Sequence, residues 1–215
     1  MKSLLLILAV FIGMHESSYC RDHNLSAALS DVKNIQYGIT AIDAEIKYSG
    51  SPVAMVKWDD NLGNNLLFIA EIGDNFNGDV RSKELFVYHF ITGRSGNEQL
   101  WKIYDYIGDC PVDLTLEFIN ESLAITDLDN DGVGESSFAY RMSCKGDVSA
   151  DDMKLMMHEG EKKYALRGSM NLIINGLELE KGSMIVDPSF KNGPPEFLQF
   201  AKAHWSKFKA EKSGE

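Results

Sequence analysis

The side chains with the clearest chemical pattern lie in an acidic segment, DLDNDGVGE, at residues 127–135. Aspartates stand at its first, third and fifth positions, a glycine at the sixth and a glutamate at the ninth. Calcium takes about six to eight oxygen ligands, and an EF-hand loop supplies its first ligands at this spacing, with a glycine for the sharp turn. The segment therefore predicts a calcium site whose ligands are Asp127, Asp129, Asp131, the carbonyl of Val133 and Glu135.

The segment departs from an EF-hand in its second half. The bidentate glutamate that completes an EF-hand would fall on Phe138, and both flanks have the pattern of strands. The segment resembles instead the short calcium loops of the FG-GAP and VCBS type, which lie between β-strands in extracellular proteins. A solvated acidic turn is the alternative, although carboxylates packed so closely repel one another without a cation.

Motifs of catalysis are absent from the sequence after the first twenty residues. There is no HExxH, no GxSxG, no glycine-rich phosphate loop and no histidine pair at the spacing of helical metal ligands. We therefore predict no catalytic residue, and a structural role for the calcium. Glycoside hydrolysis needs only two suitably placed carboxylates, so a hydrolase stays open, with Glu71, Asp74 and Asp79 as its candidate acids.

Composition and charge exclude some partners. The chain has 215 residues, 44% of them hydrophobic and 25% charged, which is typical of globular proteins. Its formal net charge is -11, with 21 lysines and arginines against 32 aspartates and glutamates. Clustered basic residues drive binding to nucleic acids and anionic membranes through counterion release and attraction. We therefore expect no nucleic-acid partner.

The first twenty residues have the pattern of a secretory signal peptide. Lys2 precedes an apolar run at residues 4–14, which is too short to span a hydrocarbon core of about 30 Å. Ser18 and Cys20 are small enough for cleavage after Cys20, and lipid attachment to Cys20 is the alternative. Residues 21–215 are then expected to form a single secreted or periplasmic domain without a transmembrane segment, or in the alternative an outer-membrane lipoprotein.

Two cysteines remain after such a cleavage, Cys110 and Cys144. An even pair in an oxidising compartment indicates a disulfide. Two buried free thiols are the alternative. A bridge would enclose the acidic segment and stabilise the fold by roughly 3 to 4 kcal/mol in the chain-entropy description.

Periodicity predicts a mainly β fold of antiparallel sheets, arranged as a sandwich or as FG-GAP-like hairpins. Short apolar runs alternate well enough for sheets with one buried face, and Gly160 marks a tight hairpin. Residues 26–48 are ambiguous between helix and strand. Residues 194–209 carry an amphipathic helical stripe that we expect to dock on a sheet, with a partner-binding helix as the alternative. The expected strands are residues 53–58, 65–70, 84–90, 100–107, 114–119, 123–127, 136–142, 154–158 and 163–167.

An internal similarity relates residues 53–71 to residues 123–141. Each has an apolar run, a turn rich in Asp, Asn and Gly, and a second apolar run, as a duplication would produce, although any two hairpins with polar turns look alike. Lys57 takes the first ligand position in the earlier copy, so we expect that copy to bind no ion. A further acidic turn, GDNFNGD at residues 73–79, lacks the alternate spacing and is expected to be a hairpin loop.

Several longer stretches resemble a known family. TDLDNDGVGE, FAYRMSCKGDVSADDMKLMM, KYALRG and the late FLQFAKAHWSKF are similar to secreted Bacteroidota proteins described as surface polysaccharide biosynthesis proteins. The resemblance covers most of the chain after the signal peptide and implies an envelope setting and a link to glycans. It brings no catalytic motif to these residues, so only Cys110, Cys144 and the acidic loop follow from it.

The sequence therefore predicts a calcium-stabilised β-domain that acts as a non-enzymatic binding module of the cell envelope, with a glycan or a protein as its partner. A glycan-active hydrolase with paired carboxylates is one alternative. A secreted inhibitor is another, since an acidic surface would suit a basic target enzyme. Exposed aromatic side chains beside the loop would favour glycan binding, and two carboxylates facing each other in a cleft would favour the hydrolase.

Overall fold

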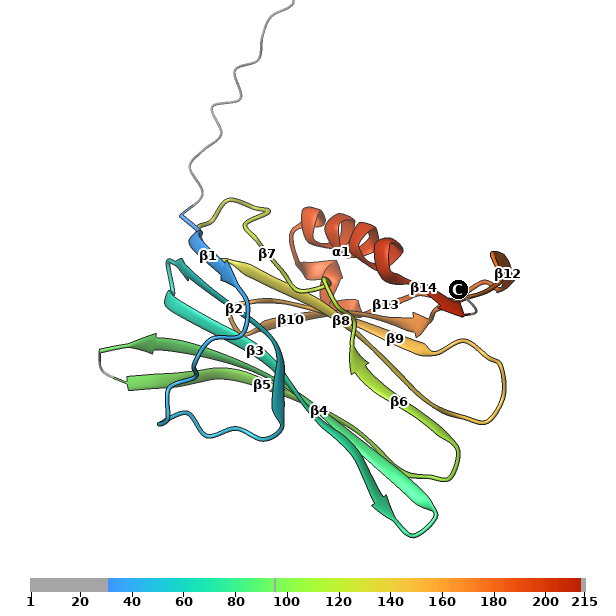
Figure 1. The fold of residues 1–215 in the computed structure, drawn as a ribbon. Helices are drawn as coiled ribbons and strands as arrows, with labels where there is room; N and C mark the ends of the chain where they lie inside the picture. The colour runs from blue at the N-terminus through green and yellow to red at the C-terminus, as the bar shows by residue number, and fades with distance from the viewer. Residues whose placement is uncertain (1–30, 95, 214–215) are drawn as a thin grey trace, which may run out of the picture.

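A computed structural model describes residues 31–94 and 96–213 of the protein. The predicted signal peptide, its cleavage site and Cys20 lie outside these residues. Within them the chain forms two facing sheets, and a helix packs on the outer face of the second sheet (Figure 1). The first sheet is antiparallel and follows the chain order, with strands β1 (Lys33–Tyr37), β2 (Ser51–Asp60), β3 (Gly63–Asn77), β4 (Val80–Gly93) and β5 (Gly96–Cys110).

The second sheet is also antiparallel and has the order β13-β10-β9-β8-β6, with β7 paired to the start of β8. Its strands are β6 (Asp113–Phe118), β7 (Ala124–Thr126), β8 (Glu135–Lys145), β9 (Asp152–Glu159), β10 (Lys162–Ser169) and β13 (Ile185–Val186). A small third sheet has the order β12-β11-β14, and its β11–β14 pair is parallel. Its strands are β11 (Asn171–Ile174), β12 (Leu177–Glu180) and β14 (Ala210–Ser213).

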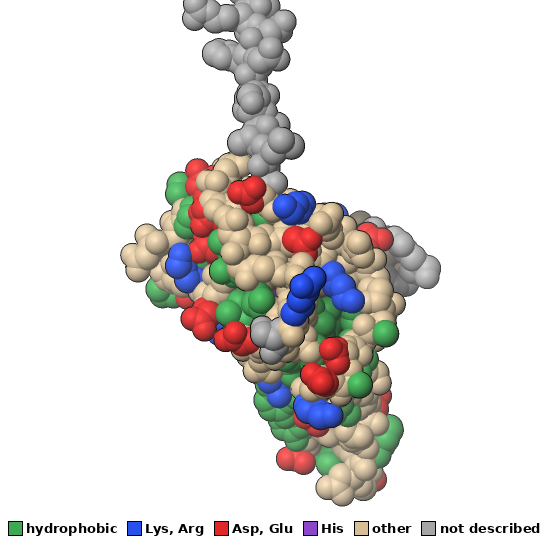
Figure 2. Space-filling view, turned by 90° about the vertical axis from the view of Figure 1, so that its left-hand side faces the viewer, with side chains coloured by type: hydrophobic (Ala, Val, Ile, Leu, Met, Phe, Trp, Pro, Cys, Tyr) green, Lys and Arg blue, Asp and Glu red, His purple; other side chains and the backbone are tan. Residues whose placement is uncertain are grey.

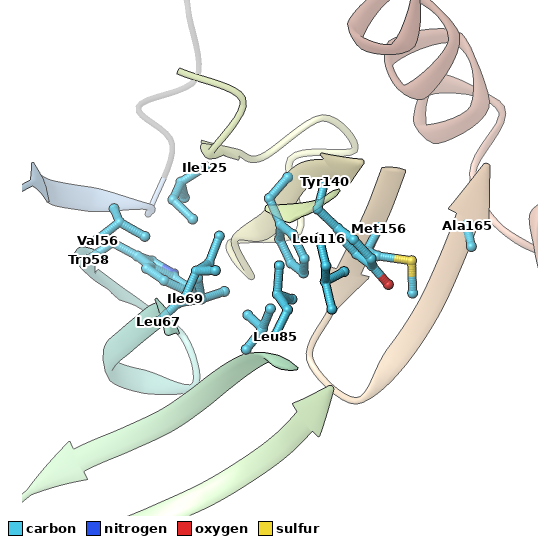
Figure 3. Close-up of a cluster of buried hydrophobic side chains, with 12 residues drawn as sticks. Val56, Trp58, Leu67, Ile69, Leu85, Leu116, Ile125, Tyr140, Met156 and Ala165 are labelled. Carbon is cyan, nitrogen blue, oxygen red and sulfur yellow. The ribbon is translucent and has the colours of Figure 1, made fainter. Parts of the chain in front are cut away.

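The main core lies between the two large sheets. Val56, Leu67 and Leu85 point into it from the first sheet and meet Leu116 and Met156 of the second (Figure 3). Each of these side chains is at most 3% exposed. Burial of one such side chain contributes about 1.5 to 3 kcal/mol. This apolar layer therefore holds the two sheets face to face as a sandwich.

The other face of the second sheet is covered by α1 (Pro195–Phe208), which follows a 3-10 helix at Pro188–Asn192. Phe197, Ala201 and Trp205 of α1 pack against the same apolar cluster as Leu155 of β9. These helical positions belong to the amphipathic stripe expected from the sequence. The predicted docking of the C-terminal helix on a sheet is confirmed.

The outer face of the first sheet carries a third apolar layer. Phe68, Phe86 and Tyr88 form it together with Ile46, which belongs to the connection before β2. The ring of Tyr48, in the same connection, meets Phe68 edge-on at a centroid distance of 5.1 Å. The segment that was ambiguous in sequence thus holds the short strand β1 and a covering loop.

The predicted mainly β fold is confirmed, and each expected strand coincides with one of β2 to β10, with differences only at the ends. The short strands β11 to β14 were not expected. The hairpin loop predicted at residues 73–79 is shorter than expected. β3 continues to Asn77, and only Gly78 and Asp79 form the turn. A bulge between Ile72 and Asn75 lets the β3–β4 pairing resume beyond the irregularity.

A disulfide joins the two sheets. It links Cys110, the last residue of β5, to Cys144 near the end of β8, with a Cα–Cα distance of 5.8 Å. The predicted pairing is confirmed, and the bridge lies at the opposite end of β8 from the acidic loop. Among the described residues, no helix is long and apolar enough to cross a membrane.

Reduction of this disulfide should lower the free energy of unfolding by roughly 3 to 4 kcal/mol, because the open chain gains conformational freedom when it unfolds. Urea denaturation with and without reductant measures the difference. A variant carrying both C110S and C144S is the control, since it should show the lower stability under both conditions. Identical denaturation curves for the wild-type protein with and without reductant would contradict the prediction.

Candidate metal centre and its surroundings

The acidic segment connects β7 to β8, since β7 ends at Thr126 and β8 begins at Glu135. Two residues of the connection have a positive φ, Asn130 at 59° and Gly132 at 80°. Left-handed backbone at these positions reverses the chain within a few residues. The reversal brings side chains from both halves of the loop toward one another.

The loop docks on the turn between β2 and β3. The backbone N–H of Asn61 donates to the Gly132 carbonyl at 2.9 Å, and the Asn61 side-chain amide donates to the Asp131 carbonyl at 3.0 Å. A Cβ on Gly132 would lie 2.2 Å from Asn61 Nδ2, so glycine also permits the close approach. The two turns related by the internal sequence similarity are therefore in direct contact.

Asp60 is the second anchor of the loop. Its Oδ2 accepts hydrogen bonds from the Gly134 N–H at 2.9 Å and from Trp58 Nε1 at 2.8 Å. Its Oδ1 accepts the Leu62 N–H at 2.8 Å. One carboxylate thus joins the acidic loop, the β2–β3 turn and the end of the core between the sheets.

The carboxylates of the loop converge in two overlapping groups. Asp127, Asp129 and Glu135 each offer an oxygen within 4.8 Å of the others, and Asp129 and Asp131 form a second such group with Glu159. The structure thus brings every predicted carboxylate into one of the two groups, with Asp129 shared by both. Coordination by the Val133 carbonyl stays a prediction.

Glu135 is the most deeply buried of these acids, with 0% exposure. Its carboxylate accepts a hydrogen bond from Thr126 Oγ1 at 2.7 Å and from the Leu128 N–H at 3.1 Å. Burial, with a smaller effect of the Asp129 and Asp127 charges, raises the pKa of Glu135 to about 7 against the lowering effect of these hydrogen bonds. A cation beside Glu135 would favour its charged form.

Asp129 has an unsatisfied oxygen at the centre of the cluster. Its Oδ1 is buried and accepts no hydrogen bond from the part of the chain that the structure describes. Burial raises the pKa of Asp129, and the charges of Asp131 and Glu159 raise it as well. Carboxylate oxygens are the hard ligands that calcium prefers, and a divalent cation would relieve both the desolvation and the repulsion.

Glu159 is the member of the cluster that sequence reasoning missed. It is the last residue of β9 and pairs with Glu135 in the β8–β9 ladder, which places it beside the loop. It is 6% exposed, and its Oε2 lies 2.6 Å from Lys162 Nζ. The hairpin at Gly160 marked the end of β9, but only the strand register could have indicated this proximity.

A cavity of about 450 Å³ opens beside the second group, with Asp131, Glu159 and Lys162 in its lining. Two carboxylates therefore meet in a concave site, as a glycoside hydrolase requires. A hydrolase also needs one of them protonated to act as the general acid. Glu159 is ion-paired with Lys162, which already engages the carboxylate that a hydrolase would need free.

The three acids that the sequence offered for hydrolysis lie elsewhere. Glu71 accepts a backbone hydrogen bond at 2.7 Å, and burial raises its pKa, with a smaller contribution from Glu117. Glu117 is itself ion-paired with Arg141. Asp74 and Asp79 are exposed near the β3–β4 turn. Glu71 is thus half-buried and hydrogen-bonded, whereas Asp74 and Asp79 are open to solvent.

In the earlier copy of the internal similarity, the acidic side chain is already hydrogen-bonded. Asp59 accepts the side-chain amide of Asn34 at 2.6 Å and that of Asn64 at 2.5 Å. These two hydrogen bonds lower the pKa of Asp59. The expectation that this copy, with Lys57 at its first position, binds no ion stays a prediction.

A row of four rings fills the core next to Asp60. His89 lies 5.0 Å from Trp58 and 5.2 Å from Trp101, and Trp101 stacks on His158 at 4.0 Å, all between ring centroids. His89 Nε2 lies 2.8 Å from Asn65 Oδ1, a carbonyl oxygen that can only accept, so Nε2 is the protonated nitrogen. Burial lowers the pKa of His89 to about 4, so the ring is neutral near pH 7.

The exposed aromatic rings of β5 do not lie beside the acidic loop. Tyr104 is 54% and Tyr106 48% exposed, and their rings are 6.5 Å apart with an angle of 20° between their planes. Tyr104 also stacks on Phe86 at 5.0 Å. The Tyr106 hydroxyl lies only 1.8 Å from where a Cβ on Gly108 would be, so this ring follows the strand with one face toward solvent.

Comparison with known proteins identifies no relative. No family model matches the chain, and neither a curated protein nor a solved structure matches it.

Acid should destabilise the protein through His89. Its pKa is about 4 in the folded protein against an ordinary value of 6.5, so the unfolded chain binds more protons between these pH values. The free energy of unfolding should therefore fall as pH drops through this window, by about 3 kcal/mol for this group. Denaturant titrations of wild type and H89F across the window measure the effect, because phenylalanine keeps a ring there but does not titrate.

The difference between the two proteins is the decisive quantity. Glu135, whose pKa is raised, has the opposite effect on stability and contributes equally to both. H89F should lose less stability than wild type toward low pH. The same pH dependence in both proteins would show that His89 is not held neutral by burial.

Proposed function

We propose that this protein is a calcium-stabilised, non-enzymatic module of the cell envelope that binds a glycan. The observation that carries the glycan assignment is the pair of exposed, nearly parallel tyrosine rings on β5. The face of an aromatic ring carries negative charge density. The C–H groups on one side of a sugar ring are weakly positive and can pack against such a face.

The position of the tyrosines also supports a glycan as ligand. β5 is the edge strand of the first sheet, so its neighbourhood is open along the strand. Tyr104 hydrogen-bonds Glu84, and Lys102 Nζ lies 4.9 Å from the centroid of the Phe86 ring. Polar groups beside flat aromatic faces can bind the hydroxyl groups of a sugar whose ring is stacked.

The proposed ion has a structural role. Calcium would be held by Asp127, Asp129 and Glu135, with Asp131 and Glu159 on the adjoining side. The loop that carries these ligands is fixed to the first sheet through Asp60 and Asn61. An ion there would therefore stabilise the contact between the two sheets at the end opposite the disulfide.

The envelope setting is the part of the proposal that concerns location. The Cys110–Cys144 disulfide suits an oxidising compartment. The signal-peptide pattern and the resemblance to secreted Bacteroidota proteins described as surface polysaccharide biosynthesis proteins lead to the same setting. A surface polysaccharide is accordingly the proposed class of ligand.

Removal of calcium should lower the melting temperature of the purified protein. We expect a dissociation constant of roughly 10⁻⁴ to 10⁻³ M, as in extracellular modules. At ten times this concentration the ion would add about 1.4 kcal/mol to the free energy of unfolding. Thermal denaturation in EDTA and in millimolar calcium measures the shift.

D129A should abolish the calcium-dependent shift, because Asp129 belongs to both carboxylate groups. D74A is the matched control, because it removes an exposed aspartate outside the loop and should leave the shift unchanged. Coincident melting curves in EDTA and in calcium for the wild-type protein would mean that the loop is a solvated turn.

Loss of the tyrosine rings should weaken glycan binding. Replacing both Tyr104 and Tyr106 by alanine is expected to reduce affinity for a surface polysaccharide at least about tenfold, since an aromatic contact contributes about 0.5 to 1.5 kcal/mol beyond area burial. F76A is the control, because Phe76 is 71% exposed on β3. Isothermal titration with purified polysaccharide fragments measures the affinities. Unchanged affinity in the double variant would refute the assignment of the site.

A further inference from the structure

A second feature of the same edge bears on the identity of the ligand. The chain has a net charge of -11, and on the side drawn in Figure 2 lysine and arginine side chains stand among aspartates and glutamates. In contrast, a pocket of about 330 Å³ between β5 and the strands β8 to β10 is lined by four cations and one carboxylate. The charged residues of its lining are Lys102, Lys154, Lys163, Arg167 and Asp105.

Strand alternation places the cations in this pocket. Lys163 and Arg167 flank Ala165 on β10, and Ala165 belongs to the core between the sheets, so all three point toward the first sheet. β5 is the edge strand of that sheet, so the first sheet does not cover the second sheet beyond β5. Beyond this edge the inward face of β10 borders the pocket, where Lys163 is exposed and the side chain of Arg167 is 42% exposed.

The single carboxylate of the pocket is already engaged. Asp105 Oδ2 accepts the Tyr140 hydroxyl at 2.8 Å and is ion-paired with Lys154 Nζ. Its charge is therefore compensated inside the pocket wall. Lys102 Nζ lies over the Phe86 ring on the outer face of the first sheet, 4.9 Å from its centroid. The cations left inside the pocket are Lys163 and Arg167.

These remaining cations are only partly compensated. Arg167 Nη1 lies 2.9 Å from Asp187 Oδ2, and this is the only ion pair of Arg167 within the described part of the chain. Lys163 has no ion pair with any residue that the structure describes. Such a group of cations attracts an anion, and an arginine fork suits carboxylate, sulfate and phosphate groups.

The exposed tyrosine lies on the edge strand that borders the pocket, and its ring stacks on Phe86 on the outer face of the first sheet. Tyr104 lines the pocket together with Lys102, and its ring is nearly parallel to that of Tyr106. A ligand with its anionic group in the pocket would pass over the edge strand β5 to place its adjoining part on the two rings. The volume of about 330 Å³ lies at the lower end of the range for small-molecule sites, which suits one charged sugar unit.

We infer that this pocket binds the anionic group of an acidic glycan whose neighbouring sugar ring stacks on Tyr104 and Tyr106. The inference rests on the proposed glycan-binding function and adds the charge class of the ligand. The anion is a carboxylate or a sulfate ester carried by the sugar. Both need the same cations, and the choice between them is made by experiment.

The test uses the whole secreted chain and three probes: an oligogalacturonate, a heparin-derived oligosaccharide and a neutral cello-oligosaccharide of equal length. Isothermal titration at low and at physiological salt gives the affinities. We expect one or both acidic probes to bind at least about tenfold more tightly than the neutral probe. Their affinity should fall with added salt, because the pocket contacts are ionic.

K163S is the informative variant and K202S the matched control. Both replace an exposed lysine, one in the pocket and one on α1, so neither substitution disturbs the core. K163S should weaken binding of the acidic probe about tenfold, the loss expected for one charge-assisted hydrogen bond. K202S should change it less than about twofold.

The outcomes separate this inference from the proposed function. Equal binding of neutral and acidic probes, with the loss confined to the tyrosine variants, would overturn the inference and leave glycan binding standing. Equal affinity of K163S and K202S for the acidic probe would also overturn it, and would indicate that the inward lysines only protect the sheet edge from pairing. Binding of poly-glutamate as tight as that of the acidic sugar would exclude a glycan as the ligand. Failure of all three oligosaccharides to bind would refute the proposed function itself.

Discussion

Two sheets pack face to face only where their inward side chains are apolar. This constraint decides where polar and charged side chains can occupy inward positions. Leu67 and Leu85 meet Leu116 in the middle of the sandwich, and no charged group could replace them without a large desolvation cost. Polar inward positions occur at its borders. His89 lies at the end near the acidic loop and Lys163 beyond the edge of β5. Both candidate sites are therefore consequences of where the apolar core stops.

At the end of the sandwich near the acidic loop, hydrogen bonds hold the carboxylates close together despite their mutual repulsion. Asp60 and Asn61 fix the backbone of the loop on the first sheet, while Glu135 is fixed to the second sheet as the first residue of β8. The carboxylates cannot move far apart without breaking these bonds. The contact between the two hairpins thus keeps the carboxylates close together although they repel one another. A bound cation would replace this repulsion by attractive contacts that link the two sheets.

The sequence was sufficient wherever the determinant is local. Alternation located β2 to β10, the amphipathic stripe located α1, and cysteine parity located the disulfide. The spacing of Asp127, Asp129 and Asp131 marked the candidate metal loop because all three lie within a few residues. Glu159 was missed because it reaches the loop only through the β8–β9 register, which no local pattern encodes. The cationic pocket was missed for the same reason, since it depends on which strand forms the edge.

The two candidate sites have opposite charges and yet share the β9–β10 hairpin, and the strand period of two explains how. Lys162 pairs with Glu159, on the face where Glu135 and the acidic loop lie. Lys163, the next residue, points to the opposite face and lines the cationic pocket. The thickness of the sheet therefore separates the carboxylate cluster from the cations. At physiological ionic strength the Debye length is about 8 Å, so the distant carboxylates would be largely screened from an anion in the pocket while its direct contacts persist. An acidic protein can in this way present a local basic site without neutralising the charges that would bind its ion.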